Sequence, residues 1–191
     1  GAEFLLIPNG SPYYRGKMET RYNHMVARAV ETGLPVIYLN MVGGQDDQVF
    51  DGGSFVLNPG GALALQMPVF DECITQLDLE RTPEGWRAVE GAKAHLPDEW
   101  EQDYRVMVEA LRDYLGKSGF KKVLLGLSGG VDSAIVAAIA VDAIGAENVR
   151  CVMLPSEYTS PESLEDAEAV AKALGCHYDY VPISEGREAI T

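Results

Sequence analysis

Apolar residues in the first part of this chain occur in short runs or recur every three to four positions, the patterns of strands and helices respectively. The expected elements are a strand at 4–7, a helix over 18–30 closed by Gly33, a strand at 34–42, and a hairpin of 54–57 and 62–67 around Asn58-Pro59-Gly60-Gly61. The polar stretch 43–51, which lies between the strand at 34–42 and the hairpin, is expected to be a loop.

Beyond the hairpin, apolar and polar residues alternate over 72–79, which predicts a further strand with Cys73 in the core. Periodicity then fades into a polar segment interrupted by Pro and Gly, the composition of a linker between domains. We therefore expect a first domain at 1–80, a linker at 81–100 and a second domain at 101–191.

The second part alternates helices and strands. They are a helix over 100–115 ending at Gly116, a strand at 123–127, a helix over 132–144, a strand at 149–154, a helix capped by Ser160 and Pro161 and closed by Gly175, and a strand at 178–183. Strands that alternate with helices predict a parallel α/β sheet, which binds ligands at the carboxyl ends of its strands.

The hexapeptide Ser-Gly-Gly-Val-Asp-Ser at 128–133 lies between a predicted strand and a predicted helix. Paired glycines let the backbone amides approach an anion, and the positive end of the following helix favours the same position, so the loop suits a phosphate group. It lacks the lysine of a Walker A motif and the glycine spacing of a dinucleotide fingerprint. The Asp132 carboxylate is a suitable ligand for Mg²⁺. The plainer alternative for the loop is a glycine turn that joins a strand to a helix, and for Asp132 it is an acidic residue that only interacts favourably with the helix dipole.

Composition narrows the function classes. The 191 residues carry 15 Lys and Arg against 29 Asp and Glu, a formal charge of −14, which argues against a nucleic-acid surface. No apolar run approaches the about 18 residues of a membrane-spanning helix, so we expect a cytoplasmic protein with no membrane partner. The spacing of Cys73, Cys151 and Cys176 fits reduced thiols rather than a zinc site.

The chain begins without methionine, at Gly1-Ala2-Glu3, as though within a longer protein, and we expect it to be an internal segment. Its short sheets are expected to expose apolar surface that further chain, or other copies in a homo-oligomer, would cover.

The 128–133 motif resembles the PP-loop of the N-type ATP pyrophosphatases, which split ATP between its α and β phosphates. The loop alone does not distinguish between the GMP, asparagine, tRNA lysidine and NAD synthetases.

Residues 1–17, 40–46 and 50–55 look like the second half of a nitrilase-type carbon–nitrogen hydrolase domain. A nitrilase-like domain joined to a PP-loop domain resembles the glutamine-dependent NAD synthetases, and residues 149–183 are similar to that family as well. The resemblance implies an α/β fold: the C-terminal half of an α-β-β-α nitrilase-like domain, then the start of a parallel-sheet PP-loop domain.

The resemblance further implies that ammonia from L-glutamine hydrolysis amidates deamido-NAD, after ATP has adenylated it, and that AMP and pyrophosphate are released. ATP with Mg²⁺ would bind at Gly126, Leu127, Ser128, Gly129, Gly130, Val131, Asp132 and Ser133, with Asp132 as the metal ligand. Ser11 and Lys17 would match residues that hold glutamine, although taken alone they are an ordinary turn serine and surface lysine.

A nitrilase-type site also needs a nucleophilic Cys, a Glu base and a Lys, which we expect upstream of Gly1. The three cysteines present do not replace that nucleophile. We expect the 191 residues alone to make neither glutamate nor NAD. Another PP-loop ligase, and a protein that binds ATP without catalysis, remain the alternatives.

Overall fold

The computed structural model describes residues 1–184 and 186, so the end of the predicted second domain lies outside the described residues. The chain forms two compact units, Gly1–Ala110 and Leu111–Thr191, each of which has its own core. The elements of the first unit are α1 (Lys17–Thr32), β1 (Leu5–Asn9), β2 (Val36–Asn40), β3 (Val42–Gln45), β4 (Gln48–Asp51), β5 (Phe55–Leu57), β6 (Leu63–Gln66), β7 (Leu79–Thr82) and β8 (Gly85–Ala88).

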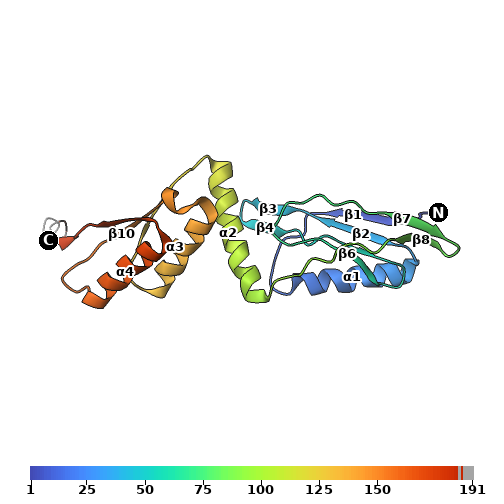
Figure 1. Cartoon of the computed structure of the whole chain (residues 1–191), viewed down its shortest axis with the longest axis horizontal. Coiled ribbons are helices and arrows are strands. Elements are labelled where there is room, and N and C mark those ends of the chain that lie inside the picture. Colours follow the sequence, from blue (N-terminus) through green and yellow to red (C-terminus); the bar gives the residue numbers. More distant parts are fainter. Residues whose placement is uncertain (185, 187–191) are drawn as a thin grey trace. The chain divides into compact units, whose positions relative to one another are not determined.

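The main sheet of the first unit has the order β1-β2-β5-β6. Strands β1 and β2 are parallel, whereas β2, β5 and β6 pair antiparallel in sequence. Helix α1 runs along one face of this sheet (Figure 1), and their contact encloses a core around Tyr38, Phe55 and Leu57. The expected helix and hairpin are confirmed, and Gly33 closes α1 in the left-handed conformation.

The opposite face of the sheet packs against chain that follows the hairpin. Val56, Leu65 and Ala88 form this second cluster, and Ala88 comes from the β7–β8 hairpin. The sequence predicted no element over 81–100, but the hairpin and backbone bonds from 91–94 to β6 attach much of this stretch to the first unit. The domain boundaries themselves stay a prediction.

The strand expected over 72–79 is wrong. Residues 71–78 form no strand, and regular pairing starts only at Leu79. Cys73 is exposed rather than in the core, and Ile74 is fully exposed. Alternation produces a strand only where a neighbouring strand offers backbone partners, and this segment has none over most of its length.

The stretch 43–51, expected to be a loop, instead holds most of a short antiparallel hairpin. Strands β3 and β4 pair from Val42 with Asp51 to Gln45 with Gln48. The two-residue turn places Asp46 at a positive φ of 55°, a conformation that Asp tolerates better than most residues. The hairpin ends at Asp51, whose position matters for the first candidate site.

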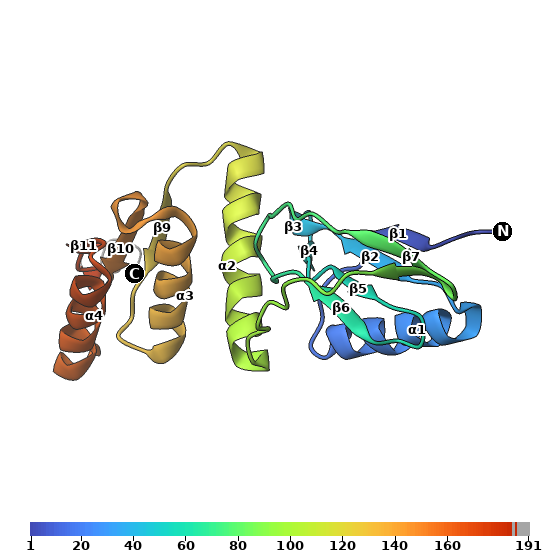
Figure 2. The same ribbon diagram turned by 45° about the vertical axis from the view of Figure 1, so that its right-hand side comes forward.

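The second unit is a three-stranded parallel sheet with two helices. Its elements are β9 (Val123–Gly126), α3 (Val131–Ile144), the short 3₁₀ helix η1 (Ala146–Asn148), β10 (Val149–Met153), α4 (Pro161–Leu174) and β11 (His177–Tyr180), preceded by α2 (Glu99–Ser118), which spans the boundary between the units. The strand order is β11-β10-β9, all parallel as predicted. Helices α3 and α4 lie side by side against the sheet (Figure 2).

The core of the second unit is built from small and branched residues of both helices around the central strand. Ala137, Val149, Cys151, Ala167 and Ala171 are all nearly or fully buried there. Outward-facing apolar side chains, by contrast, remain uncovered, with Leu124 69% and Val136 51% exposed. Among the described residues, no helix combines the length and the apolar character needed to cross a membrane.

Candidate functional sites

The loop between β9 and α3 keeps the strand–loop–helix arrangement expected from the sequence. Leu127 is buried and donates its N–H to Val152 O (2.9 Å), which fixes the start of the loop to the central strand. Gly130 is the N-cap of α3 with extended backbone dihedrals, and Ser128 and Gly130 are exposed. The loop therefore emerges at the carboxyl end of a parallel strand, where such sheets bind ligands.

Hydroxyl groups of the loop bond within the loop. Ser128 N donates to Ser133 Oγ (3.2 Å), Ser133 Oγ donates to Gly130 O (3.0 Å), and the two serine hydroxyls lie 3.1 Å apart. These contacts hold the chain in a tight curve around the start of α3. The amide of Gly130 donates to Ser128 Oγ (3.4 Å), whereas the amides of the residues that follow it in the first turn of α3 have no partner within the helix and suit an anion.

Gly129 is the tightest point of the loop. Its φ is 78°, and a Cβ added there would meet Ser163 O of α4 at 2.3 Å. Since both the backbone conformation and the neighbouring helix exclude a side chain, only glycine fits this position. The loop is thus packed against the first turn of α4 as well as leading into α3.

Asp132 is exposed in the first turn of α3. Within the described residues, no group of three or more His, Cys, Asp or Glu side chains is placed to hold a metal ion. Mg²⁺ is commonly bound by one or two carboxylates together with the phosphates of a nucleotide, so a single Asp beside an anion loop is a donor set that suits it.

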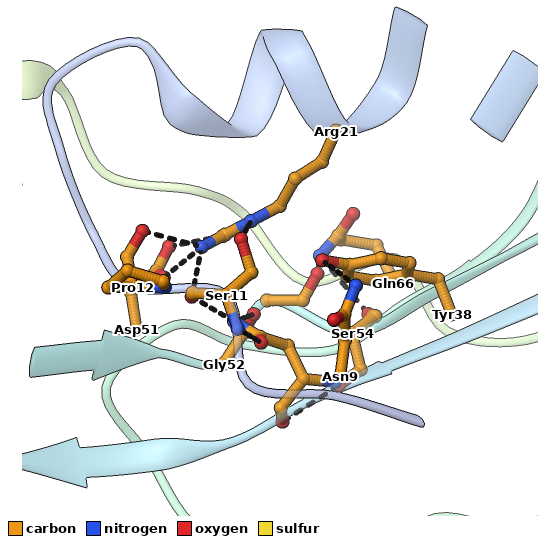
Figure 3. A network of polar contacts seen from close by, with 11 residues as sticks. Asn9, Ser11, Pro12, Arg21, Tyr38, Asp51, Gly52, Ser54 and Gln66 are labelled. Atoms are coloured by element: carbon orange, nitrogen blue, oxygen red, sulfur yellow. Dashed lines mark hydrogen bonds and ion pairs between the residues drawn. The ribbon is translucent and has the colours of Figure 1, made fainter. Parts of the chain in front are cut away.

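The second candidate site surrounds Ser11, which follows β1. Ser11 N donates to Asn40 Oδ1 (2.8 Å), and Asn40 Nδ2 donates back to Ser11 O (3.1 Å). Asn40 ends β2 and also bonds to Gly52 O and to the Ser54 hydroxyl. The network in Figure 3 thus brings together the three sequence stretches that resemble a nitrilase-type domain.

A buried ion pair completes this network. Arg21 of α1 donates from Nη1 and Nη2 to the two carboxylate oxygens of Asp51, at 2.7 Å each, and the side chains are only 3% and 1% exposed. Arg21 Nη2 also donates to Ser11 O (2.7 Å), and Arg21 Nε donates to Ser11 Oγ (3.2 Å) (Figure 3). A buried charge pair is better tolerated when further hydrogen bonds accompany it, and here Arg21 also donates to Ser11.

Lys17, the other residue matched to glutamine binding, is the first residue of α1 and is half-buried. Its ammonium lies 4.4 Å from the centre of the Tyr14 ring. Lys17 and Arg21 are four residues apart and therefore share one face of the helix. Arg21, which is hydrogen-bonded to Ser11, therefore lies one helical turn from Lys17.

The segment between Ser11 and Lys17 is tied to the first turns of α2 within the first unit. Tyr13 Oη donates to Asp103 Oδ1 (2.8 Å), and Arg15 forms an ion pair with the same carboxylate. These hydrogen bonds, from Arg15 first and then from Tyr13, lower the pKa of Asp103. The Arg15 guanidinium also lies 4.7 Å from the centre of the Trp100 ring.

The sequence analysis did not identify Arg21 as a site residue. It placed Asn40 and Asp51 only within the stretches 40–46 and 50–55 that resemble a nitrilase-type domain. A signal for Arg21 existed: it lies on the apolar face of α1, between Met18 and Tyr22, where a charged residue is unusual unless paired. No pattern along the chain identified its partner, 30 residues away.

The cysteines remain free thiols in the structure. Cys151 Sγ lies 3.5 Å from Cys176 Sγ, and burial raises the pKa of Cys151 to about 12. A thiol with such a pKa is almost fully protonated near neutral pH, so Cys151 is not suited to be a nucleophile.

Comparison with known proteins gives consistent matches along the chain. Residues 1–87 match the Carbon-nitrogen hydrolase family and residues 103–191 match the NAD synthase family. The chain is 59% identical over 190 residues to the glutamine-dependent NAD(+) synthetase of Rhodobacter capsulatus, covering 100% of this chain and 34% of that protein. It is 41% identical over 181 residues to that of Acinetobacter baylyi, covering 95% and 33%.

Among solved structures, that of the glutamine-dependent NAD+ synthetase from Acinetobacter baumannii in complex with adenosine diphosphate is similar, with a TM-score of 0.90 and 40% identity over 97% of this chain and 35% of that one. The chain therefore spans about a third of the length of the relatives it matches. These matches confirm the expected fold class, a nitrilase-like segment followed by the start of a PP-loop domain.

Proposed function

Because this chain belongs with the glutamine-dependent NAD(+) synthetases, of which it spans about a third, we propose that the protein forms NAD from deamido-NAD, ATP and glutamine-derived ammonia. The observation that carries the proposal is the joining, in one chain, of a carbon–nitrogen hydrolase segment to an NAD synthase segment with an intact 128–133 loop. We further propose a cytoplasmic location and a homo-oligomeric assembly.

In this proposal, residues 126–133 bind the phosphates of ATP. The support is the geometry of the loop: backbone amides at the start of α3 and the positive end of that helix converge where β9 ends. A relative with 40% identity was solved in complex with ADP, which agrees with an adenine nucleotide as the ligand class.

Asp132 is proposed to bind Mg²⁺ together with those phosphates. When bound, the ion neutralises negative charge that builds up as ATP is split. The residues of the chain then do the positioning: Leu127 anchors the loop to β10, and Gly129 lets it pass close to α4.

Ser11 and Lys17 are proposed to hold glutamine. The support is their placement: Ser11 is fixed by Asn40 and Arg21, and Lys17 begins α1, whose positive end adds to its own charge. Both a cation and a helix N-terminus favour an anionic group such as a carboxylate. Release of ammonia away from bulk water keeps it unprotonated and therefore nucleophilic.

The experiment that tests this function is ATP–pyrophosphate exchange by the full-length protein. We expect exchange of labelled pyrophosphate into ATP to require Mg²⁺ and deamido-NAD, and Asp132→Asn to raise the Mg²⁺ concentration needed for half-maximal exchange. Asp142→Asn, at the far end of the same helix, is the matched control and is expected to behave like the unmodified protein.

Exchange that depends on a different acceptor, with none for deamido-NAD, would instead identify another PP-loop ligase. Exchange of normal strength in a variant whose 128–133 loop is replaced by a Gly-Ser linker would remove the loop from the reaction.

A further inference from the structure

The N–H, the C=O and the hydroxyl oxygen of Ser11 each form a hydrogen bond with a neighbouring side chain, which leaves the hydroxyl proton and one lone pair of its oxygen unused among the described residues. Its N–H and C=O are paired with the Asn40 amide at 2.8 and 3.1 Å, and the C=O also accepts from Arg21 Nη2 at 2.7 Å. The hydroxyl oxygen accepts from Arg21 Nε at 3.2 Å. The backbone and the oxygen of Ser11 are therefore both held in place.

The direction of the Arg21–Ser11 hydrogen bond follows from the chemistry of the guanidinium. Arginine has only donors, so Ser11 Oγ must be the acceptor in this contact. A hydroxyl also has one proton to donate, and no hydrogen bond of the described residues uses the Ser11 hydroxyl as a donor. Arg21 thus leaves Ser11 with a free proton, and this proton suits an acceptor on a ligand.

Arg21 is itself held rigidly. Its bidentate contact with Asp51, at 2.7 Å to each oxygen, uses the planar fork of the guanidinium and leaves Nε facing Ser11. Asp51 is fixed at the end of β4 by the β3–β4 hairpin. Because the pair is buried and neutral overall, it acts by orienting Ser11 rather than by presenting a charge to a ligand.

We propose that Arg21, fixed by Asp51, is a positioning residue that presents the Ser11 hydroxyl as a hydrogen-bond donor to an acceptor oxygen of glutamine. This inference rests on the proposed role of Ser11 in glutamine binding. It adds the residues that orient the hydroxyl and the chemical class of the group that the hydroxyl is proposed to recognise, a hydrogen-bond acceptor.

The test compares two nitrogen sources in the full-length protein. The variants are Ser11→Ala, Arg21→Lys and the double variant, and NAD formation is measured with glutamine and, separately, with ammonium. We expect each single variant to raise the KM for glutamine about tenfold, the size of one lost hydrogen bond. Because Arg21 acts through Ser11, the double variant should be no worse than the worse single variant.

Ammonium-supported NAD formation is expected to stay within about twofold in all three variants, which a general loss of structure would not allow. Arg28→Lys is the matched control, because Arg28 is exposed on the same helix and pairs only with the nearby Glu31 in the described structure. It should leave both activities unchanged.

The outcomes separate the two proposals. An unchanged KM in Ser11→Ala would remove Ser11 from glutamine binding, and the inference would fail with it. A raised KM in Ser11→Ala combined with no effect of Arg21→Lys, or with effects that multiply in the double variant, would overturn the inference alone.

If Arg21→Lys does not fold, the apolar pair Arg21→Met with Asp51→Leu replaces it, because buried ion pairs can be exchanged for apolar residues without loss of stability. A folded apolar-pair variant with an unchanged KM would also overturn the inference.

Discussion

Among single residues, Gly129 shows how one position serves both conformation and packing. Its positive φ and its closeness to Ser163 are separate constraints, and they meet in the middle of the candidate ATP loop. The sequence indicated the first constraint through the paired glycines. The second could not be predicted, since Ser163 is brought there only by the packing of α4.

Gly129→Ala is expected to lower the free energy of unfolding of the second unit by at least about 1 to 3 kcal/mol, the cost of a strained backbone conformation. Urea denaturation measures this. Gly130→Ala is the control: Gly130 has φ of −85° and its added Cβ meets only Ser128 Oγ at 3.5 Å, so a clearly smaller loss is expected. Equal losses at the two positions would contradict the argument.

Asp103 gives the first unit a dependence on pH. Hydrogen bonds from Arg15 and Tyr13 lower its pKa in the folded protein below the ordinary 3.8. The folded state therefore gains stability from the ionised carboxylate above about pH 4, and loses this gain as the pH falls through the lowered pKa. We expect Asp103→Asn to be less stable than the unmodified chain at pH 7, with the difference shrinking below pH 4.

Urea denaturation between pH 7 and pH 2 measures this difference. A difference that is constant over that range, or that grows as the pH falls, would show that the carboxylate charge is not the source of the stabilisation.

At the scale of elements, the end of α2 shows why one glycine stops a helix and another does not. The sequence placed the end at Gly116, but the helix continues to Ser118 and Gly119 takes the positive φ of 79°. Phe120 N donates to Leu115 O (2.9 Å) and Gly119 N to Gly116 O (3.3 Å), which is a Schellman motif. Gly116 is therefore an interior helical residue.

Gly116→Ala is accordingly expected to stabilise this chain by roughly 0.5 to 1 kcal/mol, because glycine within a helix costs about that much relative to alanine. The added Cβ meets no atom within 4 Å. Gly119→Ala, at the positive φ, should destabilise instead. Thermal and urea denaturation of both variants provide the measurement, and a destabilising Gly116→Ala would place the helix end where the sequence suggested.

The two errors in strand prediction have a common cause. Residues 72–79 alternate as a strand would but lack a partner along most of their length, whereas 43–51 look like a loop and yet pair as β3 and β4. A strand forms only where a neighbouring strand supplies backbone hydrogen bonds, and the local sequence pattern does not show which segment that neighbour is.

At the scale of the whole molecule, the chain forms two units with separate cores, and the proposed function assigns glutamine binding to the first and ATP binding to the second. Under the proposed function, Lys17→Ala in the full-length protein should lower glutamine-dependent NAD formation and spare the ammonium-dependent reaction. Asp132→Asn should lower both, since both need ATP. Rates measured with each nitrogen source test this, and equal impairment of both reactions by Lys17→Ala would mean that Lys17 does not act on glutamine.

The sequence by itself determined the order of helices and strands in the second unit and the 128–133 loop, because these depend on periodicity, capping residues and glycines that lie close together along the chain. Only the tertiary structure decided what surrounds Ser11. Arg21 and Asp51 are 30 residues apart, and Asn40 lies 29 residues from Ser11. Buried charges and amides require partners, but the backbone path chooses which ones, so such a network becomes visible only once the chain is folded.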